Sequence, residues 1–391
     1  MTLDPNIAHL VQTLEALPEL DGRYQNLQHI NPTRGAFSVV FKAYDRVEGK
    51  SVAIKFYSIS RHCQSNDYRR DAFRREPEIL SSLLSKERCL QLIGTLSTYE
   101  LPVPMPTGGS FLLNCEYFIV EWIDADIDAF FFKPEATTPL VRLKIFKGLI
   151  LAVDSLHSLG VFHRDLKMDN MREATRAFRN VIVAIDLGTA ARATSDRIID
   201  SYDSQTGALQ YSAPEALGGL AGHRTIAKYT DLYALGCMLF ELFNPDLFFN
   251  AFSLHNPLYP SLIHGMQSYI DSRAGEAAQA KQWRHALKDL GGGVAAINID
   301  DTGSTVPPAI TDLLNELLHR LTHVDYARRP TLEWARQRVD IAIRVLENQR
   351  EFDRLNAMKK QRRKDRIEQQ RLKDEKLRLR KNVVQKAVTH A

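Results

Sequence analysis

The apolar pattern of this chain changes character near Asp124, and this change constrains the fold more than any other feature. Before it, short runs rich in β-branched and aromatic residues, such as 37–41 and 52–56, predict strands. After it, apolar residues recur at helical spacing over 140–159, and Gly160 then marks a helix end. Strands followed by helices predict an α+β fold, in which a small strand-rich lobe precedes a larger helical lobe. A cleft between two such lobes is a favoured place for a ligand.

The composition is that of an ordinary globular protein. The chain has 391 residues, of which 44% are hydrophobic and 25% charged. These values exclude collagen-like, low-complexity and fully disordered chains. No run of about 18 apolar residues occurs, so we expect no membrane span, and the first residues lack the features of a signal peptide. The four cysteines match no zinc or redox spacing, which favours a reducing, cytoplasmic setting.

The same patterns divide the chain into segments. Residues 1–22 predict a helical lead-in, 23–122 the strand-rich lobe and 123–346 the helical lobe. Residues 244–308, inside the helical lobe, form a long insert-like region of mixed character with a predicted flexible loop. Residues 347–391 predict a basic, charged helical tail.

Four short motifs follow one another in a fixed order. The four motifs are Val52-Ala53-Ile54-Lys55, His163-Arg164-Asp165-Leu166-Lys167 with Asn170, Ile185-Asp186-Leu187-Gly188, and Ala213-Pro214-Glu215. Taken singly, each motif has an ordinary explanation, because aspartates often cap loops and a strand lysine often extends to solvent. Together, over about residues 24–345, they make the chain resemble a eukaryotic-type (Hanks-type) Ser/Thr protein kinase. The resemblance implies the bilobal kinase fold, with the strand-rich segment as N-lobe and the helical segment as C-lobe.

The resemblance also implies ATP and Mg²⁺ as cofactors, and it assigns the phosphate-binding groups. Phosphoryl transfer depends mainly on positioning and charge neutralisation. Lys55 would hold the α- and β-phosphates of ATP. A buried lysine needs a carboxylate partner, for which Glu76 has the family's spacing and Glu78 is the alternative.

The loop residues take the remaining chemical roles that the resemblance implies. Asp165 would be the catalytic base and Lys167 would neutralise the γ-phosphate. Asp186 and Asn170 would hold Mg²⁺, a hard cation that prefers oxygen ligands.

The adenine site is predicted from position alone. Residues 118–123 resemble the strand that enters the hinge, with Val120 as a small gatekeeper. The backbone of Glu121 and Ile123 would then meet the adenine edge, beside Ala53. The other reading of this segment is an ordinary buried strand.

The glycine-rich loop departs from the family pattern. Only Gly35 of its glycines is present, while Thr33 and Ser38 occupy the outer positions. Side chains there crowd and stiffen a turn that glycine would leave free. We therefore expect slow or weak nucleotide binding.

Two further departures concern the catalytic machinery. Pro77 follows Glu76, and proline in a helix interior costs about 3 kcal/mol. Either the helix begins near Arg75, or it is kinked. Ala208 stands where the family has a threonine, whose hydroxyl would link the catalytic aspartate and lysine.

The segment from Asp186 to Glu215 offers many hydroxyl groups. A phosphate on one of them could be received by Arg164. We predict autophosphorylation within this segment, although loops are in general rich in serine and threonine. The hydroxyl-bearing residues are Thr194, Ser195, Ser201, Tyr202, Ser204 and Thr206.

Two motifs resemble structural parts of the family. Asp231 is expected to anchor the catalytic loop, and Arg329 to pair with Glu215 of the Ala-Pro-Glu motif. These residues support the site without touching the reacting groups.

Charge is concentrated at the end of the chain. The formal net charge is +4, but residues 351–391 carry +8, which leaves −4 for residues 1–350. The large apolar residues of the tail keep no heptad, which argues against a coiled coil. A solvated helix is the simplest reading; docking to an acidic partner or weak contact with nucleic acid are the alternatives. No aromatic residue after Phe352 could stack on a base.

Three functions compete. The leading one is an ATP-dependent kinase that transfers the γ-phosphate to Ser/Thr hydroxyls of proteins, including its own. The second is a pseudokinase or weakly active kinase that serves as a partner-binding module, which the departures motivate. The third is a small-molecule kinase, against which the Ala-Pro-Glu motif and Arg329 favour a protein substrate.

Overall fold

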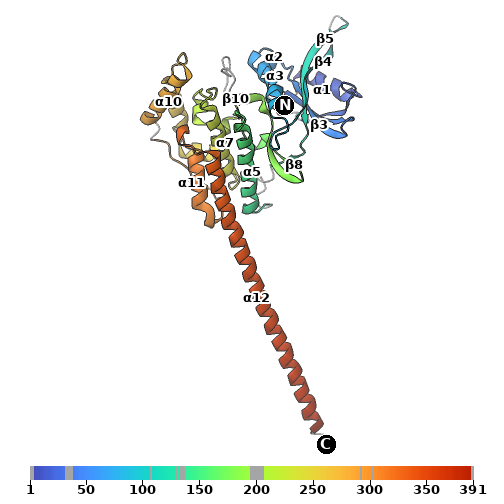
Figure 1. Ribbon diagram of the computed structural model, residues 1–391, viewed down its shortest axis with the longest axis vertical. Coiled ribbons are helices and arrows are strands. Elements are labelled where there is room, and N and C mark those ends of the chain that lie inside the picture. Colours follow the sequence, from blue (N-terminus) through green and yellow to red (C-terminus); the bar gives the residue numbers. More distant parts are fainter. Residues whose placement is uncertain are drawn as a thin grey trace.

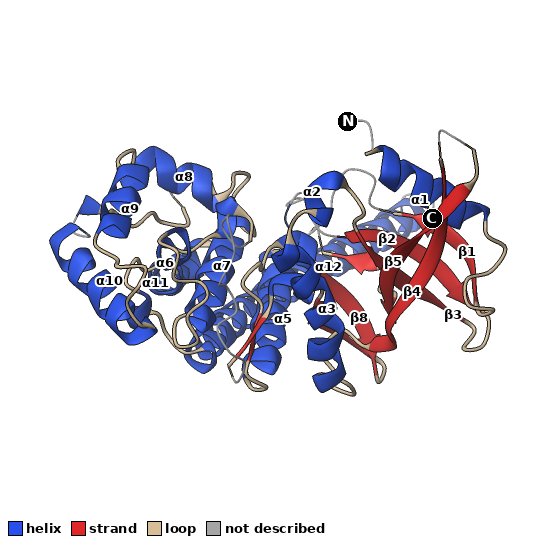
Figure 2. Cartoon of the chain, turned by 90° about the horizontal axis from the view of Figure 1, so that it is seen from above, coloured by secondary structure: helices blue, strands red, loops and turns tan. Residues whose placement is uncertain are grey.

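Figure 1 shows the computed structural model, a two-lobed body from which one long helix extends. The structure describes residues 4–30, 38–105, 108–127, 131, 137–193, 207–290, 293–300 and 303–388. Seen from above, the strands gather in one lobe and most helices in the other (Figure 2). The predicted bilobal α+β fold is therefore confirmed.

One antiparallel sheet forms the N-lobe, with strand order β1-β2-β3-β5-β4. Its strands are β1 (Tyr24–His29), β2 (Ser38–Asp45), β3 (Lys50–Tyr57), β4 (Leu92–Pro104) and β5 (Ser110–Glu121). The register sets Lys55 of β3 between Val40 of β2 and Phe118 of β5, and Ala53 opposite Val120. Because side chains alternate along a strand, Ala53 and Lys55 share one face of the sheet.

The other face of this sheet is covered by α1 (Pro5–Ala16). Asp4 caps this helix, because its side chain accepts a hydrogen bond from the Asn6 N–H at 2.9 Å. Leu10 and Leu14, one helical turn apart, are fully buried on a cluster that includes Phe41. This packing supports one face of the sheet, and the opposite face is the one that carries Ala53 and Lys55.

The helix that faces the cleft is α3 (Asp67–Ser82), which follows the short α2 (Arg61–Gln64). The Asn66 side chain caps it by accepting from the Arg69 N–H at 3.1 Å. Of the two alternatives for Pro77, a helix that begins near Arg75 is excluded, since α3 begins at Asp67 and Pro77 lies well inside it. Pro77 supplies no N–H to the helix, and it is buried against the lobe interior.

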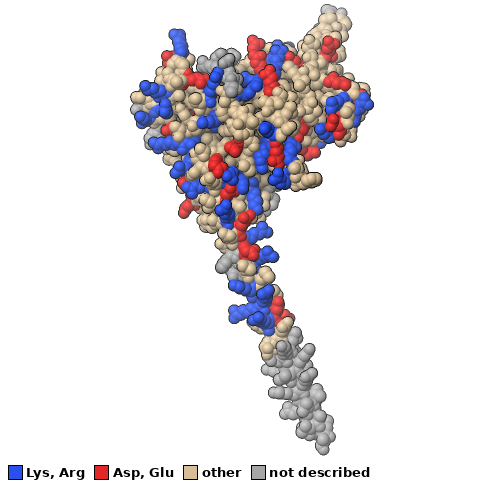
Figure 3. Space-filling model, viewed as in Figure 1, with Lys and Arg blue, Asp and Glu red and all other residues tan. Residues whose placement is uncertain are grey.

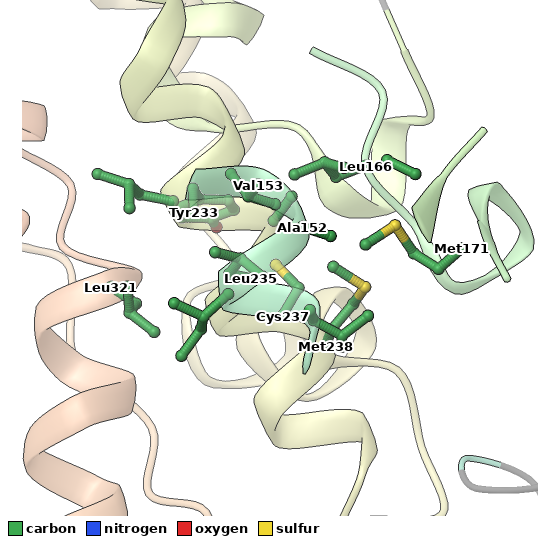
Figure 4. Close-up of a cluster of buried hydrophobic side chains, with 14 of the residues drawn as sticks. Ala152, Val153, Leu166, Met171, Tyr233, Leu235, Cys237, Met238 and Leu321 are labelled. Carbon is green, nitrogen blue, oxygen red and sulfur yellow. The ribbon is translucent and has the colours of Figure 1, made fainter. Parts of the chain in front are cut away.

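The C-lobe is built around α5 (Pro139–His157) and α7 (Ala227–Glu241). Its other elements are β6 (Ala125–Asp126), β7 (Val161–Phe162), β8 (Met171–Arg176), β9 (Arg179–Ala184), β10 (Ala191–Arg192), α6 (Pro214–Leu217), α8 (Phe248–His255), α9 (Tyr259–Ser268), α10 (Glu276–Leu290) and α11 (Thr311–Leu321). Figure 4 shows side chains of α5, α7 and α11, among them Val153, Met238 and Leu321, in one buried cluster. Leu166, within the loop between β7 and β8, and Met171, the first residue of β8, join this cluster and anchor that loop on the core.

Residues 244–308, expected to be mixed and partly a flexible loop, contain the helices α8, α9 and α10. Trp283 of α10 is fully buried. Its ring lies so close to Gly218 that a Cβ atom there would stand 2.3 Å from Cζ3. The region is therefore packed against the segment that follows α6.

The last helix, α12 (Leu332–Val388), has 57 residues, which corresponds to about 86 Å. Its first turns pack on α5, where Lys147 Nζ lies 2.6 Å from Asp340 Oδ1 and Lys144 Nζ lies 2.9 Å from Glu347 Oε1. From Glu347 to Arg371 every described side chain is exposed. In the part of the chain that the structure describes, no helix is both long and apolar enough to cross a membrane.

Candidate active site

The predicted phosphate-binding lysine lies where three elements meet. Lys55 Nζ of β3 is 2.8 Å from both carboxylate oxygens of Glu76 on α3 and 3.0 Å from Oδ1 of Asp186. Lys55 and Glu76 are both buried. Glu78, the alternative partner, lies at the surface instead and pairs with Arg192 at 3.2 Å. The structure thus brings Lys55 together with Glu76.

The charges of this group support one another. Burial lowers the pKa of Lys55, but the neighbouring carboxylates of Asp186 and Glu76 outweigh it, so the net pKa is raised. Lys55 in turn holds the pKa of Asp186 below its usual value. The Asp186 side chain is 52% exposed. The site therefore combines a fixed ammonium group with an ionised carboxylate that is half exposed.

One buried carboxylate holds the predicted catalytic loop in place by hydrogen bonds. Asp231 of α7 accepts hydrogen bonds from the N–H groups of His163 at 2.8 Å and Arg164 at 2.7 Å. The expected anchoring role of Asp231 is confirmed by these bonds. Arg164 adopts a φ of 63° and Asp186 one of 61°. Such left-handed backbone costs energy for residues other than glycine, so the surrounding bonds must hold both residues in place.

Three donors orient the predicted base. Asp165 accepts hydrogen bonds from Lys167 Nζ at 3.2 Å and from Asn170 Nδ2 at 3.2 Å, both on Oδ2. Its Oδ1 accepts the backbone N–H of Ala208 at 2.8 Å. The backbone of Ala208 therefore reaches the carboxylate even though the residue lacks a hydroxyl group.

A model of the protein kinase domain family matches residues 25–339 of this chain. The chain belongs to this family. The predicted family is thereby confirmed, and the arrangement of its four motifs in space agrees with it.

Three proteins similar to this chain have names that describe them as Ser/Thr kinases. The chain is 26% identical over 322 residues to "Serine/threonine kinase NLK" of Caenorhabditis elegans, which covers 78% of this chain and 44% of that protein. It is 29% identical over 225 residues to "Serine/threonine-protein kinase PrkC" of Bacillus subtilis, with 57% and 30% covered. It is 27% identical over 224 residues to "Probable serine/threonine-protein kinase PknB" of Bifidobacterium longum, with 56% and 30% covered. The aligned region is thus less than half the length of each relative.

The predicted hinge of this kinase domain leaves β5 beside β3. Val120 is 3% exposed and Ala53 is 7% exposed. The Glu121 carboxylate accepts the N–H of Gln91 at 2.9 Å and forms an ion pair with Arg176 of β8. This side chain therefore joins the lobes, and the Glu121 N–H is also engaged, since it donates to the Gln91 carbonyl oxygen at 3.0 Å. Ile123 lies two residues further on and is partly buried.

Sequence reasoning missed a contact at the mouth of the cleft. Lys42 Nζ of β2 lies 2.9 Å from Oδ1 of Asp124 and 4.6 Å from the centre of the Trp122 ring. It links the N-lobe to the hinge. No local sequence motif predicts this contact, because the contact depends on how β2 lies over the hinge. Gly35 and Thr33 lie outside the described residues, and Ser38 is the first residue of β2.

The expected scaffold pair of the C-lobe is confirmed. Arg329 and Glu215 are fully buried, with Arg329 Nη2 2.9 Å from Glu215 Oε2. The pair fixes α6 below a small pocket beside Asp165, whose walls include Ala208 and Tyr211.

Proposed function

We propose that this chain is an ATP-dependent Ser/Thr protein kinase. One observation carries the proposal: the Lys55–Glu76–Asp186 network and the Asp165–Lys167 pair are both assembled, and they lie near enough that the charge of Lys167, after that of Lys55, helps to lower the pKa of Asp186. The first supplies charge for the phosphates of ATP, and the second faces the place where a hydroxyl group would attack. The predicted roles of these residues remain part of the proposal.

The donor set fits Mg²⁺, which takes oxygen ligands. Asp186 offers a half-exposed carboxylate that binds Lys55 through only one oxygen. Asn170 donates to Asp165 through its Nδ2, which leaves its amide oxygen for a metal. In the described ranges no three His, Cys, Asp or Glu residues cluster, so phosphate oxygens and water would complete the ligand set. The ion would neutralise charge that develops on the transferred phosphoryl group.

Asp165 and Lys167 would then take different roles in phosphoryl transfer. Asp165 would accept the hydrogen bond of the attacking hydroxyl, held in position by its three donors. Lys167, 3.2 Å from that carboxylate, would stabilise charge on the γ-phosphate. Phosphoryl transfer needs little more than this positioning and charge balance. The assembled set favours an active enzyme over a pseudokinase.

A protein is the better substrate class than a small molecule. The buried Arg329–Glu215 pair and the helices of 244–308 hold a platform beside Asp165. Tyr211 in this platform donates a hydrogen bond to Glu241 at 2.7 Å. A small metabolite would need no such supported surface.

Autophosphorylation has support from an unsatisfied arginine. Within the described structure, Nε and Nη2 of Arg75 are buried and have no hydrogen-bond partner. Burial lowers the pKa of Arg164, and the positive charge of the nearby Arg75 lowers it further. Arg192 stands two residues before the hydroxyl-rich residues 194–206, which lie outside the described residues. Arg164, expected to receive a phosphate there, is buried and donates to the Thr189 and Ala221 carbonyl oxygens, so the phosphate would pair with Arg75 instead.

A phosphotransfer assay on the purified chain tests the proposal. We expect Asp165→Ala and Glu76→Gln to reduce incorporation of labelled phosphate into a protein acceptor by about 10²-fold or more. Glu78→Gln, a neighbouring glutamate at the surface, is the matched control and should stay near wild type. Equal phosphotransfer by wild type and Asp165→Ala would refute the kinase proposal. Mass spectrometry that finds no phosphate between Asp186 and Glu215 after ATP incubation would refute autophosphorylation alone.

We also propose that this kinase works in the cytoplasm. All four cysteines are free and buried, as a reducing compartment allows. Fractionation of the source cells tests the location, and recovery in a secreted fraction would refute it.

A further inference from the structure

The projecting part of α12 presents an unusual charge. We call residues 358–371 the basic stretch. It carries seven cations and two acids, so its net charge is +5. All fourteen of its side chains are exposed, and Figure 3 shows cationic side chains along the helix beyond the body. The cations are Lys359, Lys360, Arg362, Arg363, Lys364, Arg366 and Arg371.

These cations are not neutralised by their own helix. Asp365, one of the two acids, accepts a hydrogen bond from Gln361 at 2.8 Å. Across the described part of the chain, no ion pair involves any of the seven cations; Arg354–Glu351 is the last pair along α12. The body contributes nothing, because α12 leaves it before the stretch begins (Figure 1). The stretch is therefore ready to bind an external polyanion.

The charges follow a defined side of the helix. With 3.6 residues per turn, the seven cations fall within an arc of about 200°. Asp365 and Glu368 both lie in the remaining arc. The two large apolar residues of the stretch, Met358 and Ile367, point to opposite sides, about 180° apart, and are 45% and 61% exposed.

The distribution of charged and apolar side chains around the basic stretch indicates which kind of polyanion it can bind. A membrane-surface helix and a helix that docks in a protein groove both need an apolar face, which the stretch lacks. Single-stranded nucleic acid needs aromatic stacking platforms, and none follows Phe352. The major groove of B-DNA admits a helix and has phosphates along both walls, so it can use cations spread over more than half the circumference. In duplex RNA this groove is too deep and narrow.

We propose that the basic stretch binds duplex DNA through its phosphate backbone and so brings the kinase body to DNA. Binding of this kind neutralises phosphates and releases counterions. With up to seven contacts, the logarithm of the affinity should fall with the logarithm of salt concentration with a slope of up to about −6.

Fluorescence polarisation with the full chain and a labelled duplex of mixed sequence tests this. The variant Lys359→Gln/Arg362→Gln/Arg363→Gln/Arg366→Gln should lose about three to four units of the salt slope. Glutamine is a good helix former, and circular dichroism checks that the helix persists. The control variant removes four exposed cations of the body and should bind DNA like wild type. These control positions are Arg61, Lys86, Lys281 and Lys288.

The outcomes separate the partners. Equal losses in the two variants would mean that overall charge binds DNA, and would overturn the proposal. Tighter binding of polyglutamate, anionic vesicles, single-stranded DNA or duplex RNA at the same ionic strength would also overturn it. Phosphotransfer by both variants should match wild type, so this result is independent of the kinase proposal.

Discussion

Removing Arg329 should destabilise the C-lobe strongly, because this cation is entirely enclosed. Its Nη2 donates to Glu215 Oε2 at 2.9 Å, and its Nη1 donates to the Tyr229 carbonyl oxygen at 2.8 Å. Its Nε donates to the His323 carbonyl oxygen at 2.9 Å. Both members of the ion pair have fully buried side chains. The variant Arg329→Ala therefore leaves a buried carboxylate without a counter-charge.

The expected loss is about 3–5 kcal/mol of unfolding free energy, the usual cost of breaking a buried ion pair by removing one partner. This is a large share of the roughly 5–15 kcal/mol that stabilises a typical domain. In a thermal unfolding experiment on the full chain the midpoint should fall by roughly 10 °C. Glu215→Ala should act in the same direction, since it leaves the guanidinium group unpaired.

Arg328→Ala is the matched control for this experiment. Arg328 is the preceding residue, but its side chain is 72% exposed and lies 3.7 Å from Asp325. Exposed ion pairs contribute about 0–1 kcal/mol, so its midpoint should stay close to wild type. The reasoning fails if the two arginine variants unfold at the same temperature.

Three further variants test other parts of the structure. Ala208→Thr places a hydroxyl beside Asp165, the proposed catalytic base. One added hydrogen bond of about 1 kcal/mol should raise the phosphotransfer rate several-fold, and a rate at or below wild type would contradict this. Burial raises the pKa of Glu241 to about 7 from its ordinary 4.5, so the stability it contributes is full below about pH 4.5 and is lost as the pH rises to about 7. The variant Glu241→Gln should remove about 3 kcal/mol of this pH dependence, and urea unfolding of both proteins across that range measures it; identical slopes would contradict it. Gly218→Ala would drive a Cβ atom into the Trp283 ring and should cost about 1–3 kcal/mol, whereas Gly275→Ala, with nothing within 4 Å, should have little effect in thermal unfolding.

The motifs predicted the family and the bilobal fold because each places a chemical group on a short, rigid segment. The catalytic loop runs from β7 to β8, and so few residues leave little freedom for Asp165 and Asn170. The sequence also contained the information that Glu76, and not Glu78, is the partner of Lys55. Phe73 and Leu80 stand three residues before and four residues after Glu76, so they share its side of a helix, and the structure buries all three.

Other features depend on contacts between distant segments. Trp283 is buried because α10 returns to Gly218, 65 residues earlier, and no local pattern encodes that return. The contact of Lys42 with Asp124 likewise requires β2 to lie over the hinge. The sequence left two positions open for Pro77, the first turn of a helix or the interior of a kinked one. The structure places it in the interior, so tertiary packing of α3 outweighs the local preference against proline.

The projecting helix and the catalytic loop share one rigid support. The first part of α12 packs on α5, tied by the Lys147–Asp340 ion pair. At the other end of α5, His157 Nε2 lies 2.8 Å from Asp231 Oδ2, the carboxylate that also holds the catalytic loop. The basic stretch begins twelve residues after Leu346, about 18 Å beyond the last packed turn. A continuous helix would connect a polyanion bound there to the C-lobe. The helix would therefore hold the candidate active site at a fixed distance and in a fixed direction from the bound polyanion. Inserting a flexible Gly/Ser linker after Arg350 would preserve binding and catalysis separately, but should abolish any preference for substrates held at that fixed distance.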